Sequence, residues 1–287
     1  MKSYLKYSSV CSLALFASAA FGQAPDMGDA LDFAVLGGTA VTCTRSVIAG
    51  DVGISPGLAA AFTNTGCTIA GDMPPATNAA AAHAQADLAD AYSDIRNGNC
   101  TLLTLANTGT DAARNLSTLS GVTLAPGTYC IDDVAKAGVL TLNGSSNGIW
   151  IFKVVQSAAG DLTGTNFTVS MLGGGQACNV FWAPATAATM TDSALKGNIL
   201  AGNPAVGSIT LTRGSVAGSV LAAVAVTMTD TSVVGCDTLS PDESPSCKPK
   251  KHHHKHKNHH DKKGHHDDKK GHHDDKDRGY GKSPWGK

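Results

Sequence analysis

The second half of the chain alternates apolar with small polar residues in short segments that recur about every twenty positions. Residues 189–200 (TMTDSALKGNIL) align with residues 210–221 (TLTRGSVAGSVL), and residues 227–235 repeat the opening again. The offsets are 21 and 17 residues, and a further segment, 168–171, stands 21 residues before Thr189. Alternation with a period of two is typical of β-strands, and a repeat of this length is typical of a β-solenoid.

A solenoid also predicts which side chains point inward. Met190, Leu211 and Met228 should stack inside, while the threonines on either side of each should point outward. Residues 41–50 fit the same template loosely. A Greek-key sandwich would also give many short strands, but it does not explain why Thr-apolar-Thr followed by a glycine recurs. We therefore expect a mainly β protein built from stacked coils.

Residues from about 77 to 97 are rich in alanine and have a different period. Thr77 fits an N-cap, and Gly98 stands where a helix would stop. The apolar positions at helical spacing are Leu88, Ala91, Tyr92 and Ile95. This pattern predicts one long structural helix, with His83 on its surface.

The two ends of the chain differ from this body. Lys2 and Lys6 precede an apolar stretch that is too short to span a bilayer, and Ala20-Phe21-Gly22 fits a signal-peptidase site. The last segment consists mainly of Pro, Lys, His, Asp and Gly without apolar periodicity, which is typical of disorder. We expect a signal peptide over 1–22, a folded domain over 23–240 and a disordered tail over 241–287. The mature protein should be secreted, extracellular and without a membrane anchor.

Composition and motifs argue against an enzyme. Residues 23–247 carry seven Lys or Arg against seventeen Asp or Glu, and small residues dominate. The sequence has no HExxH, phosphate-binding loop or dinucleotide fingerprint. Asp51, Asp192 and Asp230 recur at repeat corners, where turn hydrogen bonding is a more economical role than a carboxylate pair or a calcium site. We expect no catalytic residue, no cofactor, no metal in the folded domain and no nucleic-acid partner.

Seven cysteines follow residue 22, so in an oxidising compartment some should pair and at least one should not. Cys67 and Cys100 bracket the predicted helix and are candidate bridge partners. Cys178 lies in an apolar strand and is the candidate for a buried free thiol. Zinc is the less favoured alternative, because no CxxC pair occurs.

Six strings, taken in order, resemble the signatures of a known family. They are residues 33–37 (FAVLG), 50–57 (GDVGISPG), 124–129 (LAPGTY), 149–152 (IWIF), 176–182 (QACNVFW) and 196–201 (KGNILA). The chain resembles the microbial ice-binding family of the DUF3494 type from about Leu31 to Cys236. The resemblance implies an irregular right-handed solenoid of triangular cross-section with a long helix along one side. It also implies a discontinuous coil order, in which the chain leaves the stack and later returns.

Members of that family often carry a Thr-Ala/Gly-x-Thr/Asn pattern on a flat ice-binding face. Here it occurs at 39–42, 163–166 and 186–189, with degenerate versions at 207–210 and 224–227. The resemblance therefore implies an ice-binding set of Thr39, Thr42, Thr163, Asn166, Thr186, Thr189, Thr210 and Thr227. The neighbouring outward set of Thr191, Thr212 and Thr229 is the next candidate. Trp150, Phe152, Phe181 and Trp182 are expected to fill the core rather than to stack on a sugar.

By this resemblance the partner is an ice crystal, whose growth or recrystallisation the protein would inhibit. A structural or adhesive extracellular protein that binds matrix polymer or mineral is the alternative. Residues 248–287 hold thirteen Lys or Arg, six Asp and ten His. That tail could be inert, could adhere to acidic extracellular polymer, or could hold a divalent metal weakly. The candidate metal ligands are His265, His266, His272 and His273.

Overall fold

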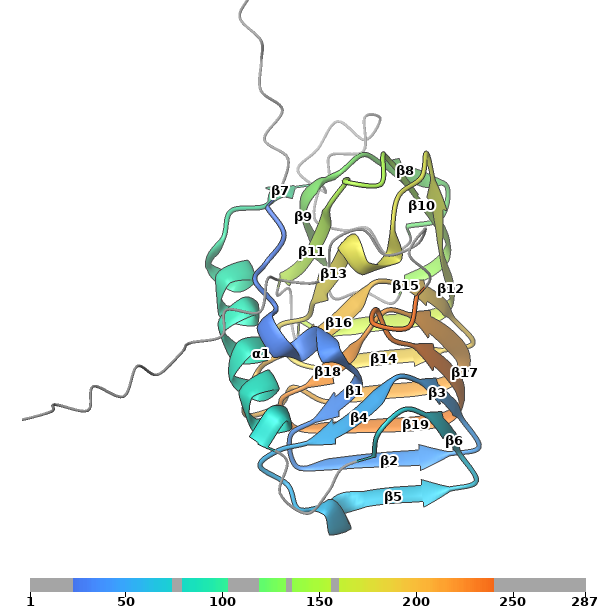
Figure 1. The fold of residues 1–287 in the computed structure, drawn as a ribbon. Helices are drawn as coiled ribbons and strands as arrows, with labels where there is room; N and C mark the ends of the chain where they lie inside the picture. The colour runs from blue at the N-terminus through green and yellow to red at the C-terminus, as the bar shows by residue number, and fades with distance from the viewer. Residues whose placement is uncertain (1–22, 74–78, 103–118, 133–135, 156–159, 240–287) are drawn as a thin grey trace, which may run out of the picture. The chain divides into compact units, whose positions relative to one another are not determined.

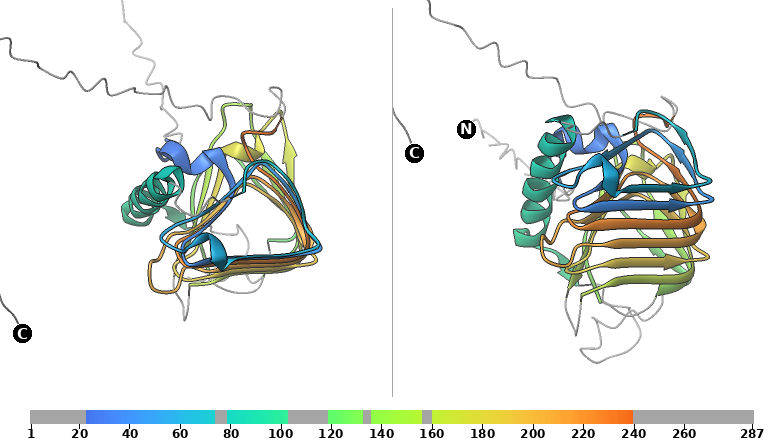
Figure 2. Two further views of the ribbon diagram at one scale, coloured as in Figure 1. Left: turned by 60° about the horizontal axis from the view of Figure 1, so that its bottom comes forward. Right: turned by 90° about the horizontal axis from the view of Figure 1, so that it is seen from below.

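The computed structural model describes residues 23–73, 79–102, 119–132, 136–155 and 160–239. The predicted signal peptide, Thr77, Cys247 and the His-rich tail lie outside these ranges. Within them, parallel strands wind into stacked coils (Figure 1). Seen end-on, the stack has a triangular cross-section (Figure 2, left). The predicted mainly β solenoid is therefore confirmed.

One side of the triangle is an eight-stranded sheet, which we call the helix-side sheet. Its order is β4 (Asp51–Ile54), β1 (Phe33–Gly37), β18 (Val220–Ala222), β16 (Asn198–Ala201), β13 (Val180–Ala183), β11 (Trp150–Val155), β9 (Gly127–Asp132) and β7 (Thr101–Leu102).

An eleven-stranded sheet bends around a corner and supplies the other two sides. Its main path is β5 (Phe62–Thr65), β2 (Ala40–Thr44), β19 (Ala225–Val234), β17 (Ile209–Ala217), β14 (Ala188–Thr191), β12 (Leu162–Leu172), β10 (Lys136–Asn143) and β8 (Val122–Leu124). Beyond the corner it also contains β3 (Val47–Ala49), β6 (Thr68–Ala70) and β15 (Ala194–Lys196).

The order of the coils does not follow the order of the chain. The coil of β4, β5 and β6 lies at one end of the stack, followed by the coil of β1, β2 and β3. Next to that coil lies the last one, β18 and β19, and from there the numbering runs backward to β7 and β8. We call the junction between β1–β3 and β18–β19 the seam. It confirms the expected discontinuity of the coil order.

The interior of the solenoid is apolar. Met190, Leu211 and Met228 are buried and occupy equivalent register positions, as the repeat predicts. The rings of Phe152 and Trp182 stack with centroids 4.0 Å apart. Trp150, Phe152 and Trp182 are buried inside the coils, which confirms that these aromatic residues belong to the core.

A second apolar cluster lies outside the helix-side sheet. Helix α1 (Ala79–Asn97) packs there with the 3-10 helix η1 (Gly28–Asp32). The buried face of α1 consists of Ala81, Ala84, Leu88, Ala91 and Ile95. It packs on outward side chains of the sheet that include Leu36, Phe181, Leu200 and Leu221. Two short 3-10 helices, η2 (Ala59–Ala61) and η3 (Ala177–Asn179), complete the described elements. Among the described helices, none has the length and apolar character needed to cross a membrane.

Three disulfides join neighbouring parts of the stack. They are Cys43–Cys67, Cys100–Cys130 and Cys178–Cys236. The pairing expected between Cys67 and Cys100 is therefore wrong, because each is bonded to a cysteine on an adjacent coil. The free thiol expected at Cys178 is also wrong. Its apolar surroundings indicated burial correctly, but burial does not distinguish a thiol from half of a disulfide.

One repeat assignment is corrected as well. Thr168 lies 21 residues before Thr189, but the register pairs Thr189 with Thr163 and Thr168 with Ala194. Thr168 therefore lies beyond the corner, on a different side of the triangle. This coil is longer than the next ones because of the insertion that contains η3 and the glycines at 173–175.

Candidate functional site

One side of the triangle carries two parallel columns of threonine. We call this side, formed by β5, β2, β14 and the first parts of β19, β17 and β12, the Thr face; its strands are seen stacked in Figure 2 (right). The first column consists of Thr63, Thr42, Thr227, Thr210, Thr189 and Thr163 in coil order. The second consists of Thr65, Thr44, Thr229, Thr212, Thr191 and Thr165.

The register of these strands makes the two columns regular. Adjacent strands in a sheet lie about 4.8 Å apart, and alternate residues along a strand lie about 6.6 Å apart. Each of these six coils contributes a Thr-x-Thr triplet. The middle residue is buried in five of them, as Met190, Leu211 and Met228 are, whereas Asn64 on the end coil is exposed. Because one such triplet repeats on six successive coils, the hydroxyl and methyl groups form a two-dimensional grid.

The hydroxyls of both columns are available to solvent. Thr189, Thr210 and Thr227 are exposed, and Thr191, Thr212 and Thr229 are partly exposed. Among the residues that the structure describes, none of the column threonines donates its hydroxyl to another protein group. Strand pairing therefore satisfies their backbone, while their side chains stay free for water or a ligand.

The expected ice-binding residues do not all lie in this grid. Thr42, Thr163, Thr189, Thr210 and Thr227 share the first column. Thr39 and Thr186 lie at the corner where the chain enters the face, and their hydroxyls donate to Val224 O and Asp161 Oδ1 respectively. Asn166 lies at the opposite corner, with a left-handed backbone (φ 50°). The Thr-x-x-Thr/Asn pattern thus spans a face together with one of its corners.

The next candidate set, Thr191, Thr212 and Thr229, belongs to the same face rather than to another one. Sequence reasoning missed Thr44, Thr63, Thr65 and Thr165. The Thr-x-Thr triplet at 42–44, 63–65 and 163–165 was a usable signal for all four.

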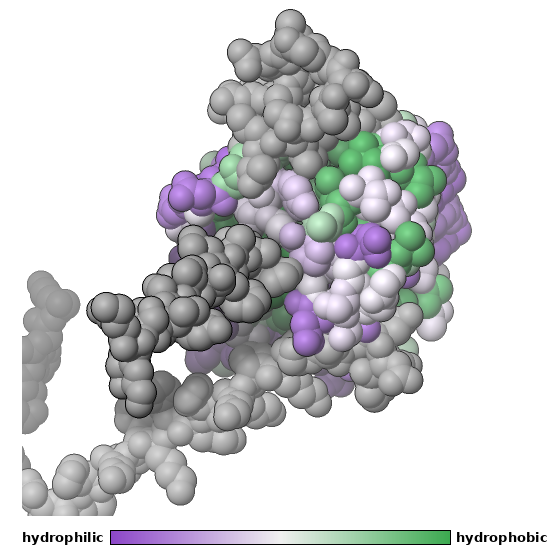
Figure 3. All heavy atoms as spheres, turned by 90° about the horizontal axis from the view of Figure 1, so that it is seen from above, coloured by the Kyte–Doolittle hydropathy of each residue, from purple (hydrophilic) through white to green (hydrophobic). Residues whose placement is uncertain are grey.

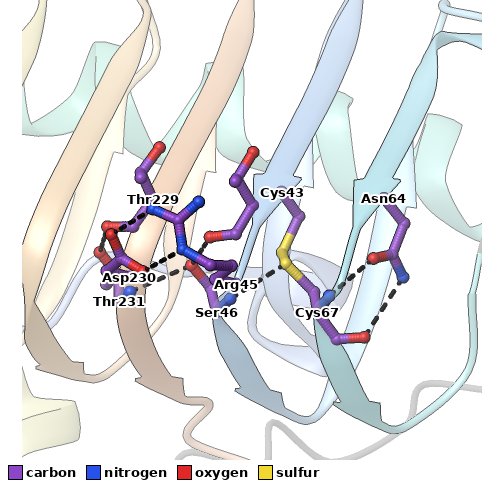
Figure 4. The surroundings of a disulfide bond; sticks show 9 residues. Cys43, Arg45, Ser46, Asn64, Cys67, Thr229, Asp230 and Thr231 are labelled. Carbon is purple, nitrogen blue, oxygen red and sulfur yellow. Dashed lines mark hydrogen bonds and ion pairs between the residues drawn. A yellow bond between two sulfur atoms is a disulfide. The ribbon is translucent and has the colours of Figure 1, made fainter.

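The corner that follows the second column carries a row of polar residues with left-handed backbone. In coil order they are Arg45, Asp230, Arg213, Asp192 and Asn166, with φ between 45° and 52°. Arg45 forms two hydrogen bonds with Asp230, of 2.8 and 2.7 Å (Figure 4). Arg213 does the same with Asp192, at 2.8 and 2.9 Å. We call this row the Arg–Asp ladder.

The ladder shifts the titration of its members. Hydrogen bonds from Arg213 and Arg45 lower the pKa of Asp192 and of Asp230 below the ordinary carboxyl value. Asp192 and Asp230 lie at repeat corners as expected, but their carboxylates bond arginine side chains rather than the backbone of the turn. Asp51 does bond the backbone, because its carboxylate accepts the Asp72 N–H at 2.7 Å. No group of three or more His, Cys, Asp or Glu within the described ranges is arranged to hold a metal.

Buried hydroxyls fasten the inner side of the same corner. Ser46 accepts a hydrogen bond from the Thr231 backbone N–H at 3.0 Å, and Ser193 accepts one from Phe167 N–H at 3.1 Å (Figure 4 for Ser46). The Cys43–Cys67 disulfide fastens the first two coils to each other beside it. The Thr face therefore rests on a packed core and is fixed at its edges.

Other sides of the molecule lack this uniformity. The helix-side sheet is covered by α1, and the third side includes Val47, Lys196 and Leu172 among its outward residues. Viewed from above, strongly hydrophobic and strongly hydrophilic residues lie next to one another (Figure 3). The regular, uncharged grid thus distinguishes the Thr face.

Fold and site together define a class: a β-solenoid that displays a flat array of small hydroxyl side chains. The family of ice-binding-like proteins matches residues 35–234. An ice-binding protein of Flavobacterium frigoris (strain PS1) is 31% identical over 209 residues, covering 71% of this chain and 73% of that protein. Ice-binding protein K3-B1 of Typhula ishikariensis is 30% identical over 208 residues, covering 67% and 84%.

A solved structure gives the same result. The crystal structure of an ice-binding protein from the Antarctic ascomycete Antarctomyces psychrotrophicus superimposes with a TM-score of 0.62. It is 28% identical, and the match covers 74% of this chain and 98% of that one. This protein therefore belongs to the ice-binding-like family.

Proposed function

We propose that this protein binds ice through the Thr face and so inhibits ice growth or recrystallisation. One observation carries the proposal: two columns of threonine in register, with free hydroxyls, on a face without a charged side chain between them. Membership of the ice-binding-like family supports it, and nothing comparable supports a matrix-binding role.

The physical case rests on repetition and rigidity. Each threonine has a hydroxyl that can anchor a water molecule and a methyl group that water must order around. A rigid grid holds such waters in a lattice-like arrangement before contact, so little entropy remains to be lost on adsorption. Each contact is weak, but twelve equivalent positions act together.

The test uses two positions on one strand. Thr210 and Ser215 both lie in β17 and are both exposed, but Ser215 pairs with Ser232 and Ala194 beyond the corner. T210Y should strongly reduce ice shaping and recrystallisation inhibition, because a protruding ring holds the Thr face away from the crystal. S215Y should keep the parent activity. If T210Y keeps it while S215Y loses it, the ice-binding surface is on the third side.

We also propose that the protein is exported and non-enzymatic. The segment 1–22 fits a signal peptide, and the Thr face offers a binding surface rather than a reactive centre. N-terminal sequencing of protein recovered from the culture medium tests this. Cleavage near Gln23 is the expected result, and an intact Met1 in the medium contradicts the signal-peptide assignment.

For the tail we propose weak metal capture by His265, His266, His272 and His273, with attraction to acidic polymer as the companion role. The support is compositional: two HHDD segments repeat seven residues apart. Nickel or zinc retention should disappear when residues 248–287 are deleted. A truncated protein that still binds the metal resin places the site in the body.

A further inference from the structure

We infer that Thr39 and Arg45 are positioning residues that clasp the seam, and that the Thr face is one continuous array only while this clasp is closed. The inference rests on the proposed ice-binding function. It gives Thr39 a role other than direct contact with ice, and it gives a role to a charged pair that ice binding itself does not use.

The seam divides the grid into two unequal parts. Thr63, Thr65, Thr42 and Thr44 belong to the first two coils, which the Cys43–Cys67 disulfide joins to each other. The other threonines of the two columns belong to coils that follow one another along the chain. Strand β2 meets β19 without a direct chain connection, so contacts between the two parts alone set the position of one against the other.

Side chains of the first part clasp the seam at both corners of the face. At the entry corner, Thr39 donates its hydroxyl to Val224 O at 3.0 Å. At the exit corner, Arg45 binds both carboxylate oxygens of Asp230, and Ser46 accepts the Thr231 N–H. The partners in the first two contacts lie 185 residues apart in sequence.

Adsorption to a lattice requires correct register, not only correct residues. If the first two coils shift or tilt against β19, their threonines no longer lie in the plane and spacing of the others. The Thr face then loses the triplets of two of its six coils, although the core of each part is intact. An exposed ion pair adds little to global stability, so the clasp should matter more for ice binding than for the melt.

The chain offers a matched control for this clasp. Thr186 occupies the same entry corner and bonds Asp161, while Arg213 and Asp192 form the same bidentate pair at the exit corner. Arg45 and Arg213 have similar side-chain exposure, 64% and 57%. The control contacts join coils that follow one another along the chain, whereas Thr39 and Arg45 act across the seam. Asparagine suits both arginine positions, because Asn166 already adopts this corner conformation.

The experiment compares T39V/R45N with T186V/R213N in an ice recrystallisation assay. We expect the seam variant to need about fivefold more protein, the factor given by a loss of roughly 1 kcal/mol, and the control less than about twofold. Each background then receives T42Y or T189Y. In the parent, both tyrosines should reduce activity. In the seam variant T42Y should cause no further loss of activity, because the coil that carries Thr42 no longer lies in the plane of the face. T189Y should still reduce activity.

Melting temperatures separate this role from general destabilisation. The two double variants should melt within a few degrees of each other. The fourfold variant R45D/D230R/R213D/D192R reverses both ion pairs but keeps the alternation of charge, so it should have the activity of the parent. Equal losses in seam and control variants, or an undiminished effect of T42Y in the seam variant, would overturn the inference. A parent that tolerates both T42Y and T189Y refutes instead the proposed ice-binding face.

Discussion

Thr42 lies directly beside Thr227 in the parallel register, although one belongs to an early coil and the other to the last. The discontinuous order of coils thus completes a ladder that no continuous stretch of the sequence contains. Both residues sit in the first column, with Thr63 on one side and Thr210 on the other.

From this relationship we predict that T42Y reduces ice activity as strongly as T189Y does. The two residues are equivalent in the grid, and a ring at either one holds the face away from the crystal. Thermal hysteresis and crystal shape should change alike, while the free energy of unfolding should change by less than about 0.5 kcal/mol, as is usual at surface positions. Loss of activity from T189Y alone would confine binding to the later coils.

The second column should contribute to binding alongside the first. Replacing Thr191, Thr212 and Thr229 by valine keeps the shape and the methyl group but removes three hydroxyls. We expect lower activity than in the parent, and a comparable loss when Thr189, Thr210 and Thr227 are replaced in the same way. An unchanged endpoint concentration for the first triple variant would restrict ice binding to the first column.

The Arg–Asp ladder should make stability depend on acid. Hydrogen bonds from arginine depress the pKa of Asp192 and Asp230 in the folded protein. Their stabilising contribution is therefore present above the ordinary carboxyl pKa of about 3.9 and is lost as the pH falls below it through the folded value. Melting curves of the parent and of R45N/R213N should differ at neutral pH and converge in strong acid. If the difference in melting temperature between the two proteins were the same at every pH, the Arg–Asp ion pairs would be excluded as its cause.

Asp237 should have the opposite effect. Burial raises its pKa, and the charges of Asp51 and Asp32 add to the shift. Ionisation of Asp237 therefore disfavours the folded state. The stability of the protein is full below the ordinary carboxyl pKa and decreases as the pH rises through the raised pKa of the folded protein. D237N should therefore raise the melting temperature at neutral pH and leave it unchanged in strong acid, since the amide oxygen can still accept the local backbone hydrogen bonds. A lower melting temperature at neutral pH would contradict this.

The fold could be predicted well from the sequence because residues that pair on neighbouring coils of a solenoid recur at a regular spacing along the chain. Met190, Leu211 and Met228 could be aligned by spacing alone, and their burial followed. The register failed at Thr168, where a longer coil broke the spacing. Corner residues such as Thr39, Thr186 and Asn166 could not be separated from face residues, because one motif spans both. Disulfide partners were also unpredictable, since the seam and the helix reorder the coils in space.

The last prediction concerns Cys178–Cys236, which links the end of the last coil to the start of β13 across 58 residues. A cross-link of this kind restricts the unfolded chain, and its removal typically costs about 2–5 kcal/mol. C178A/C236A should shift urea denaturation to lower concentration by a matching amount. Ice activity measured near freezing should stay at the parent level, because the bond lies at the corner where β13 and β16 of the helix-side sheet begin, away from both threonine columns. A variant that keeps its full melting temperature would mean that packing alone fixes this corner. One that remains folded but loses ice activity would mean that the bond also holds the Thr face in shape.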